Sequence, residues 1–130
     1  MSIFDTLFGN NSSESSQQPK TTGIPLSTRE QIEVIIQEST QQSIVIFKHS
    51  TRCSISRMVL KDFELDYQSM LNPVKWYYLD LLNYRDISNE LANRFQVEHQ
   101  SPQVLVIKNG KCVFDASHES IDWSRIIKHI

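Results

Sequence analysis

A chain of 130 residues is long enough to bury a hydrophobic core without disulfide staples and suits one domain better than two. Its 13 basic and 15 acidic side chains give a formal net charge of −2, which argues against a nucleic-acid-binding protein. No apolar run approaches the roughly 20 residues that span a bilayer, so we expect no stable membrane anchor. Two cysteines are too few for a disulfide framework or a zinc site, and we expect free thiols in a reducing, cytoplasmic compartment.

The first 23 residues have the composition of a leader and linker. Four apolar residues share one face at helical spacing: Ile3, Phe4, Leu7 and Phe8. They favour either a transient contact with a membrane or partner, or a frayed leader, because two turns are too short for a stable helix. The following stretch NNSSESSQQPKTTG has no apolar residue and cannot offset its ordering entropy. We therefore expect a flexible leader over residues 1–23 and one domain over residues 24–130.

Helix and strand patterns alternate through the rest of the chain. Apolar spacing and turn residues predict helices over residues 28–40, 54–71, 85–99 and 119–130, and strands over residues 43–49, 74–82, 103–108 and 111–115. Ser27 and Glu30 have the spacing of a capping box for the first helix. Asn109-Gly110 predicts a hairpin turn between the last two strands.

This order, α-β-α-β-α-β-β-α, predicts an α/β fold. A strand, a helix and a strand in succession form a right-handed parallel crossover, and the hairpin adds an antiparallel pair. We expect a thioredoxin-like, four-stranded mixed sheet with helices on both faces. A fold alone does not define a function, so the function has to be argued from the residues of a site.

Cys53 stands where the first long strand ends and the next helix begins. In an open α/β sheet this edge is where ligands bind. A helix N-terminus presents unpaired N–H groups and the positive end of the helix dipole, and both favour a thiolate. Lys48, Thr51 and Arg52 add cationic and polar neighbours, so we interpret them as thiol- or substrate-binding residues and Cys53 as the catalytic nucleophile. The alternative is a buried, inert cysteine.

Ser56 stands where a Cys-x-x-Cys site would have its second cysteine. A serine hydroxyl can donate a hydrogen bond to the Cys53 thiolate, which makes Ser56 a second candidate catalytic residue, but it cannot form a disulfide. Cys53 can then react only through a mixed disulfide that another thiol resolves. We expect that thiol to be a small one from solution, since Cys112 lies in a separate strand and has the pattern of buried filler.

Pro102 directly precedes a strand that the pattern places inside the sheet, where proline is normally excluded. A proline is tolerated at the start of a strand, and that is one interpretation. The other, which a thioredoxin-like fold implies, is a cis Ser101–Pro102 bond that faces Cys53 and offers backbone groups to a bound thiol or peptide. His118, between the last strand and the last helix, is either a ligand contact at the same edge or a solvated loop histidine.

Three segments, FKHSTRCSIS, HQSPQVLVIKNGK and ASHESI, resemble the YtxJ family of bacillithiol-system redox proteins, the monothiol bacilliredoxins. The resemblance covers roughly residues 25–130. It implies a thioredoxin-like fold, a nucleophile at Cys53, and protein cysteines disulfide-bonded to bacillithiol as substrates. The family site usually has the sequence Thr-Cys-Pro-Ile-Ser, whereas here Arg52 precedes the cysteine and Ser54 replaces the proline, which frees one N–H at the helix start.

The leading hypothesis is therefore a monothiol thiol–disulfide oxidoreductase that removes bacillithiol, or a similar small thiol, from protein cysteines. Its partners are S-thiolated proteins and the small thiol as co-substrate, and we expect no tightly bound cofactor, no metal and no nucleic acid. Two alternatives stay open. One is a non-catalytic thioredoxin-like binding or stress-response module, and the other is a carrier that bridges an iron–sulfur cluster between two cysteines.

Overall fold

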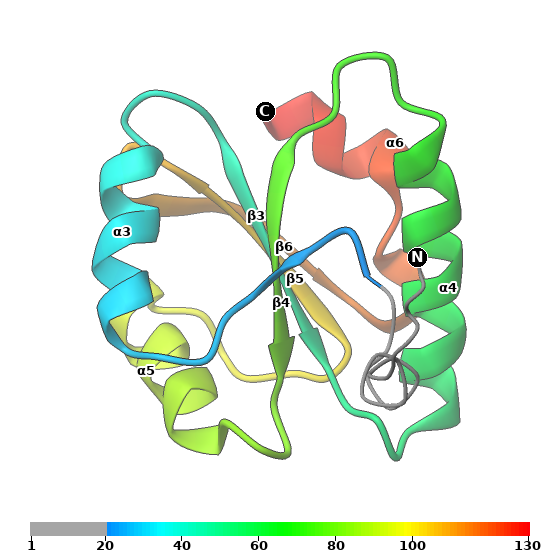
Figure 1. Cartoon of the computed structure of the whole chain (residues 1–130), viewed down its shortest axis with the longest axis horizontal. Helices are drawn as coiled ribbons and strands as arrows, with labels where there is room; N and C mark the ends of the chain where they lie inside the picture. The colour runs from blue at the N-terminus through cyan, green and yellow to red at the C-terminus, as the bar shows by residue number, and fades with distance from the viewer. Residues whose placement is uncertain (1–20) are drawn as a thin grey trace, which may run out of the picture.

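The computed structural model describes residues 21–130, which form three layers with the sheet in the middle (Figure 1). In chain order the elements are β2 (Ile24–Pro25), α3 (Glu30–Glu38), β3 (Ile44–His49), α4 (Ser54–Gln68), β4 (Lys75–Asp80), α5 (Arg85–Phe95), β5 (Gln103–Lys108), β6 (Lys111–Ser117), the 3-10 turn η1 (His118–Ser120), α6 (Trp123–Ile126) and the 3-10 turn η2 (Ile127–His129). Helices α3 and α5 cover one face of the sheet, and α4 and α6 cover the other. The leader residues 1–20, including the apolar quartet of the sequence pattern, lie outside the described residues.

The strand order within the described chain is β2-β4-β3-β5-β6. Strands β2, β4 and β3 run parallel, and β5 and β6 continue the sheet antiparallel. The predicted α/β class and mixed sheet are confirmed, but the predicted strand number was wrong, because the sheet has five strands and not four. The additional strand is Ile24–Pro25, which pairs with Tyr77 and Tyr78 of β4. Two residues carry no periodicity, and a proline is acceptable there because the strand lies at the sheet edge.

Strand β3 is buried at every position, because helices cover both of its faces. Ile44 and Ile46 point into the core beneath α3 and α5, whereas Val45 and Phe47 point into the core beneath α4 and α6. This period of two explains why the sequence of β3 is apolar almost throughout.

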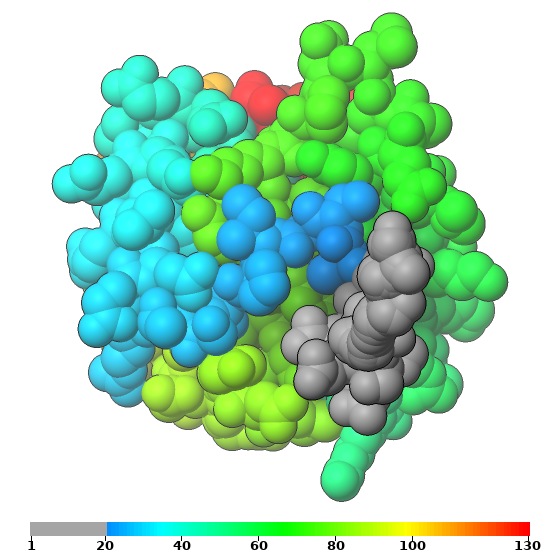
Figure 2. Space-filling view, viewed as in Figure 1, coloured from blue at the N-terminus to red at the C-terminus, as the bar shows by residue number. Residues whose placement is uncertain are grey.

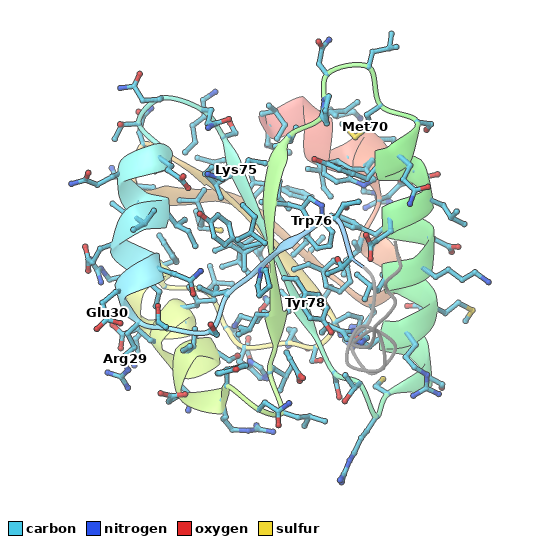
Figure 3. The ribbon with its side chains drawn as sticks, in the orientation of Figure 1. Arg29, Glu30, Met70, Lys75, Trp76 and Tyr78 are labelled. Carbon is cyan, nitrogen blue, oxygen red and sulfur yellow. The ribbon has the colours of Figure 1, made fainter. Side chains whose placement is uncertain are left out.

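Strand β4 shows the same alternation, with Trp76 and Tyr78 on the α4 side and Lys75 on the α3 side (Figure 3). Lys75 forms an ion pair with Glu38 of α3. None of the helices within residues 21–130 has both the length and the apolar composition needed to cross a membrane.

The capping box of α3 lies one residue later than predicted. Thr28 Oγ1 accepts a hydrogen bond from the Gln31 amide at 3.3 Å, and Gln31 Oε1 accepts one from the Thr28 amide at 3.0 Å. The same Gln31 oxygen accepts from the Ser27 amide at 2.7 Å. Glutamine replaces glutamate in this arrangement, so the predicted partner Glu30 instead begins the helix.

The last helix is shorter than predicted. Asp122 caps its first turn, and only Trp123 and Ile126 of the expected apolar stripe are buried. Ile127 and Ile130 stay exposed because the chain continues as a 3-10 turn, whose three-residue period moves them off the stripe. Helix α4 likewise ends before Leu71, which is 95% exposed.

Thr22 and Gly23 attach the start of the described chain to α4 and β4. The amide and the hydroxyl of Thr22 both donate to Glu64 Oε1 of α4, at 2.9 and 3.0 Å. Gly23 is buried, and a Cβ atom on it would lie 2.8 Å from the ring of Trp76. In Figure 2 this blue segment crosses the front of the molecule between α3 and α4.

We expect Gly23→Ala to lower the free energy of unfolding by about 1–3 kcal/mol, because the added methyl group must displace the Trp76 ring from a packed core. Urea denaturation followed by tryptophan fluorescence measures the change. Gln41→Ala, at an exposed turn position, is the control and should have little effect. Equal stability of Gly23→Ala and wild type would contradict the close packing at this position.

Candidate functional site

Cys53 lies at the sheet edge where the parallel strands β3 and β4 both end. It is the N-cap residue of α4, with extended backbone angles (φ −101°, ψ 120°) and a half-buried free thiol. Its amide donates to the Ser50 carbonyl at 3.2 Å, and its carbonyl accepts from the Arg57 amide at 3.0 Å. The Cys53 side chain makes no capping hydrogen bond, so the thiol lies beside the free N–H groups of the first helical turn without being bound to one.

Ser56 is fully buried, and its hydroxyl holds together the loop that carries Cys53. Ser56 Oγ lies 2.7 Å from Nδ1 of His49 and accepts a hydrogen bond from the Ser50 amide at 3.0 Å. Within the described chain it makes no hydrogen bond to Cys53. The residue that stands in place of a second cysteine therefore links the end of β3 to the start of α4, and its direct contact with the thiolate remains a prediction.

His49 is the last residue of β3 and is almost completely buried. Burial lowers the pKa of its imidazole, the Asp80 carboxylate of β4 raises it, and the Arg57 guanidinium of α4 lowers it further. The net direction favours a neutral ring, whose Nδ1 accepts the Ser56 hydroxyl proton when Nε2 carries the hydrogen. The sequence pattern does not reveal this role of His49, since its partner Ser56 lies on the next helix.

The Ser101–Pro102 bond is cis, as expected. Pro102 is buried and directly precedes Gln103, which pairs with Lys48 near the end of β3, so the cis bond lies at the edge where β3 leads into the Cys53 loop. His118 joins it there, because its amide donates to the Pro102 carbonyl at 3.0 Å and its backbone has φ 56°. The structure thus brings two distant sequence positions into one loop cluster.

Lys48 lies in a different place from the other predicted binding residues. Its side chain is fully buried on the α5 side of the sheet, where Nζ donates to the Ser88 carbonyl at 3.3 Å. Burial lowers the pKa of this amine to about 8, against a smaller opposing effect of Cys112. The side chain does not reach solvent, because residues of β3 alternate between its two covered faces and position 48 lies on the face beneath α5.

Gln103, which pairs with Lys48, binds the backbone of the loop that precedes the cis proline. Its side-chain amide donates to the Glu98 carbonyl at 2.9 Å, and its side-chain oxygen accepts from the Gln100 amide at 3.3 Å. Ser101 Oγ, in the same loop, is buried without a hydrogen-bond partner. The buried side chains of Lys48 and Gln103 therefore hydrogen-bond to loop or helix backbone, whereas the Ser101 hydroxyl makes no hydrogen bond within residues 21–130.

Thr51 and Arg52 are both exposed and line a polar cleft of about 340 Å³ directly before Cys53. The opposite wall is formed by Leu82 and Asn83, in the loop that follows β4. The sequence pattern did not indicate Leu82 and Asn83 as residues of the site. The general rule that ligands bind outside the carboxyl ends of parallel strands points to the loop after β4 but not to particular side chains.

Cys112 lies at the other end of the sheet. It pairs with Ile107, whereas Pro102 precedes the first residue of β5. Burial raises the pKa of its thiol to about 11, and Sγ lies 3.3 Å from the Phe114 carbonyl. A thiol held protonated in this way is a poor nucleophile. Among residues 21–130, no three His, Cys, Asp or Glu side chains gather where they could hold a metal ion.

The fold resembles several solved structures. A structure described as "A putative oxidoreductase with a thioredoxin fold" matches with 30% sequence identity and a TM-score of 0.70, over 82% of this chain and 91% of that chain. The thioredoxin of Fasciola hepatica matches at 24% identity and a TM-score of 0.64, over 82% and 99% of the two chains. The thioredoxin of Malassezia sympodialis matches with 18% sequence identity and a TM-score of 0.64, over 85% of this chain and 90% of that chain.

One half-buried thiol at the start of a crossover helix, beside a cis-proline loop, defines this chain as a thioredoxin-fold protein with a thiol redox function. A family model described as "Monothiol bacilliredoxin BrxC" matches residues 24–126. The chain belongs to that family, as the resemblance in the sequence implied.

We expect Ser56→Ala to lower the free energy of unfolding by about 1–3 kcal/mol, because His49 Nδ1 and the Ser50 amide lose a buried partner. Ser54→Ala, at an exposed position in the same helical turn, is the matched control. Chemical denaturation at neutral pH measures both. A loss for Ser56→Ala no larger than that for Ser54→Ala would contradict the structural role of the hydroxyl.

We expect Lys48→Met to change how stability depends on pH. The pKa of Lys48 is lowered from 10.5 to about 8 in the folded chain, so above pH 8 the unfolded chain binds more protons and wild-type stability rises with pH. Between about pH 7.5 and pH 9 this contribution amounts to ~1 kcal/mol, and the variant should lack it. Urea denaturation across that range gives the two slopes, and identical slopes would show that the amine is not desolvated.

Proposed function

We propose that this protein is a monothiol thiol–disulfide oxidoreductase that removes bacillithiol, or a similar small thiol, from protein cysteines through a mixed disulfide at Cys53. The observation that carries the proposal is the state of Ser56. This residue occupies the resolving position, is fully buried, and is hydrogen-bonded to His49 and Ser50. Cys53 therefore has no neighbouring thiol with which to close an internal disulfide.

The reaction proceeds in two exchanges. The Cys53 thiolate attacks the small-thiol sulfur of the protein mixed disulfide, forming a new S–S bond, and the protein cysteine leaves as a thiolate that takes up a proton. A second small-thiol molecule, as thiolate, then attacks the small-thiol sulfur held on Cys53. The products are the small-thiol disulfide and the regenerated Cys53 thiolate, so one thiol is consumed for each protein cysteine released.

The arrangement around Cys53 suits both exchanges. The first turn of α4 begins directly after Cys53, and its unpaired N–H groups are available to stabilise negative charge that develops on a reacting sulfur. The cleft of Thr51, Arg52, Leu82 and Asn83 supplies polar groups for a small hydrophilic thiol. The other thiol, Cys112, is held protonated and distant, so it does not compete.

The proposed substrates and compartment follow from this chemistry. S-thiolated proteins and the small thiol are the partners, with no tightly bound cofactor. Because the cycle requires a pool of reduced small thiol, the proposed compartment is the cytoplasm. Ser101, Pro102 and His118 are proposed to line the side of the site that receives the bound disulfide.

We expect wild-type protein incubated with bacillithiol disulfide to gain the mass of one bacillithiol, located on Cys53. Cys112→Ser should retain the adduct and the turnover, whereas Cys53→Ser should lose both. Intact-mass measurement and non-reducing peptide mapping detect these species. An internal Cys53–Cys112 disulfide as the main product would contradict the monothiol mechanism.

The same preparation separates the alternatives. A non-catalytic binding module would hold a thiolated protein without releasing its thiol. An iron–sulfur carrier would be coloured and contain iron after anaerobic purification, with both properties lost in Cys53→Ser.

A further inference from the structure

A shallow apolar groove begins two residues after Cys53, on the side of α4 that faces η1. Its volume is about 240 Å³, and it is lined by Ile55, Met58, Val59, Asp62, Glu119 and Ile121. Ile55 is 40% exposed and Met58 is 61% exposed, so together they present apolar surface close to Cys53 in the chain. Helix α4 packs against η1 and α6 here, so the walls of the groove come from chain segments far apart in sequence (Figure 1).

A second groove of about 290 Å³ continues the first along α4. The two share Asp62, Glu119 and Ile121, and the second adds Asp66 and Asp122. Four carboxylates therefore line the continuous surface, and no lysine or arginine lines either groove.

Asp62, Asp66 and Glu119 form no ion pair within residues 21–130. Asp122 Oδ1 accepts a hydrogen bond from the Ser124 amide at 3.0 Å as the cap of α6. The cations of α4 lie elsewhere, since Arg57 and Lys61 line a different pocket together with His49. Among the described residues, no ion pair therefore offsets the negative charge of Asp62, Asp66 and Glu119.

The distance from Cys53 to the carboxylates of α4 matches the length of a short extended peptide. At 1.5 Å per residue, Asp62 and Asp66 lie about 13 and 20 Å along α4 from Cys53. An extended chain covers about 3.3 Å per residue, so these distances correspond to roughly four to six residues from a cysteine bound at Cys53.

From these observations we propose that this surface docks the polypeptide that flanks the thiolated cysteine of a protein substrate. It selects an apolar residue beside the cysteine, which covers Ile55 and Met58, and a lysine or arginine four to six residues away, which meets the carboxylates. This inference rests on the proposed function and specifies its substrate class. A membrane surface is a poor occupant, because anionic headgroups would be repelled by the same four carboxylates.

The test compares peptides that carry one cysteine disulfide-bonded to bacillithiol and one apolar neighbour. One pair has lysine or glutamate five residues after the cysteine, and the other pair has it five residues before. Release of the thiol, followed by chromatography, gives kcat/KM for each peptide. At low ionic strength we expect one lysine peptide to react about threefold to tenfold faster than its glutamate counterpart, with the preference lost at about 0.5 M salt.

The variants assign the preference to the groove. Asp62→Asn/Glu119→Gln should abolish it, whereas Glu30→Gln/Asp115→Asn, with the same change in net charge at exposed positions elsewhere, should preserve it. Met58→Gln should slow release of the thiol from all four peptides while leaving the exchange of Cys53 with bacillithiol disulfide unchanged. Far-ultraviolet circular dichroism verifies that each variant is folded.

The outcomes separate this inference from the proposed function. If Cys53 exchanges with bacillithiol disulfide but all peptides react equally in all variants, the docking inference is wrong and the function stands. If Cys53 exchanges with neither, the function itself fails. A change in sedimentation of the free protein on Asp62→Asn/Glu119→Gln, without a change in peptide preference, would identify a second copy of the chain as the occupant and overturn the proposal.

Discussion

The burial of β3 on both faces is the constraint on which the site depends. Each residue of this strand is packed between two helical layers, so its end point and direction cannot shift. Its neighbours β4 and β5 are aligned on it through continuous registers. The loop to α4, the loop after β4 and the cis-proline loop before β5 therefore reach the same edge of the sheet, which makes a site possible with few residues.

At that edge, the buried Ser56 hydroxyl connects the end of β3, the following loop and the start of α4 through hydrogen bonds. Ser56 contacts His49 at the end of β3 and the amide of Ser50 in the loop, while lying itself in the first turn of α4. A second cysteine would make these contacts poorly, because a thiol is a weak donor and acceptor. The serine at this position thus links β3, the loop and α4, and it supplies no thiol for an internal disulfide with Cys53.

The two cysteines differ because of where the sheet places them. Cys53 is half-buried at a helix N-terminus with polar neighbours, whereas Cys112 lies on the last strand, where burial raises its pKa to about 11. The side of α4 beyond Cys53 carries apolar and acidic side chains, and the opposite side carries Arg57 and Lys61. The two sides of α4 next to the thiol therefore differ in charge: one carries carboxylates and the other carries the cations Arg57 and Lys61.

The sequence by itself determined the α/β order, the helix that begins directly after Cys53 and the missing second thiol, because each depends on local periodicity or on one residue type. It indicated a cis bond at Pro102 as one of two interpretations, and the packing of β5 within the sheet decided between them. The fifth strand was not predictable, since two residues make a strand only when β4 is beside them. The buried position of Lys48 and the acidic groove between α4 and η1 were decided by tertiary structure alone. Burial and charge depend on which elements pack together, and sequence spacing does not contain that information.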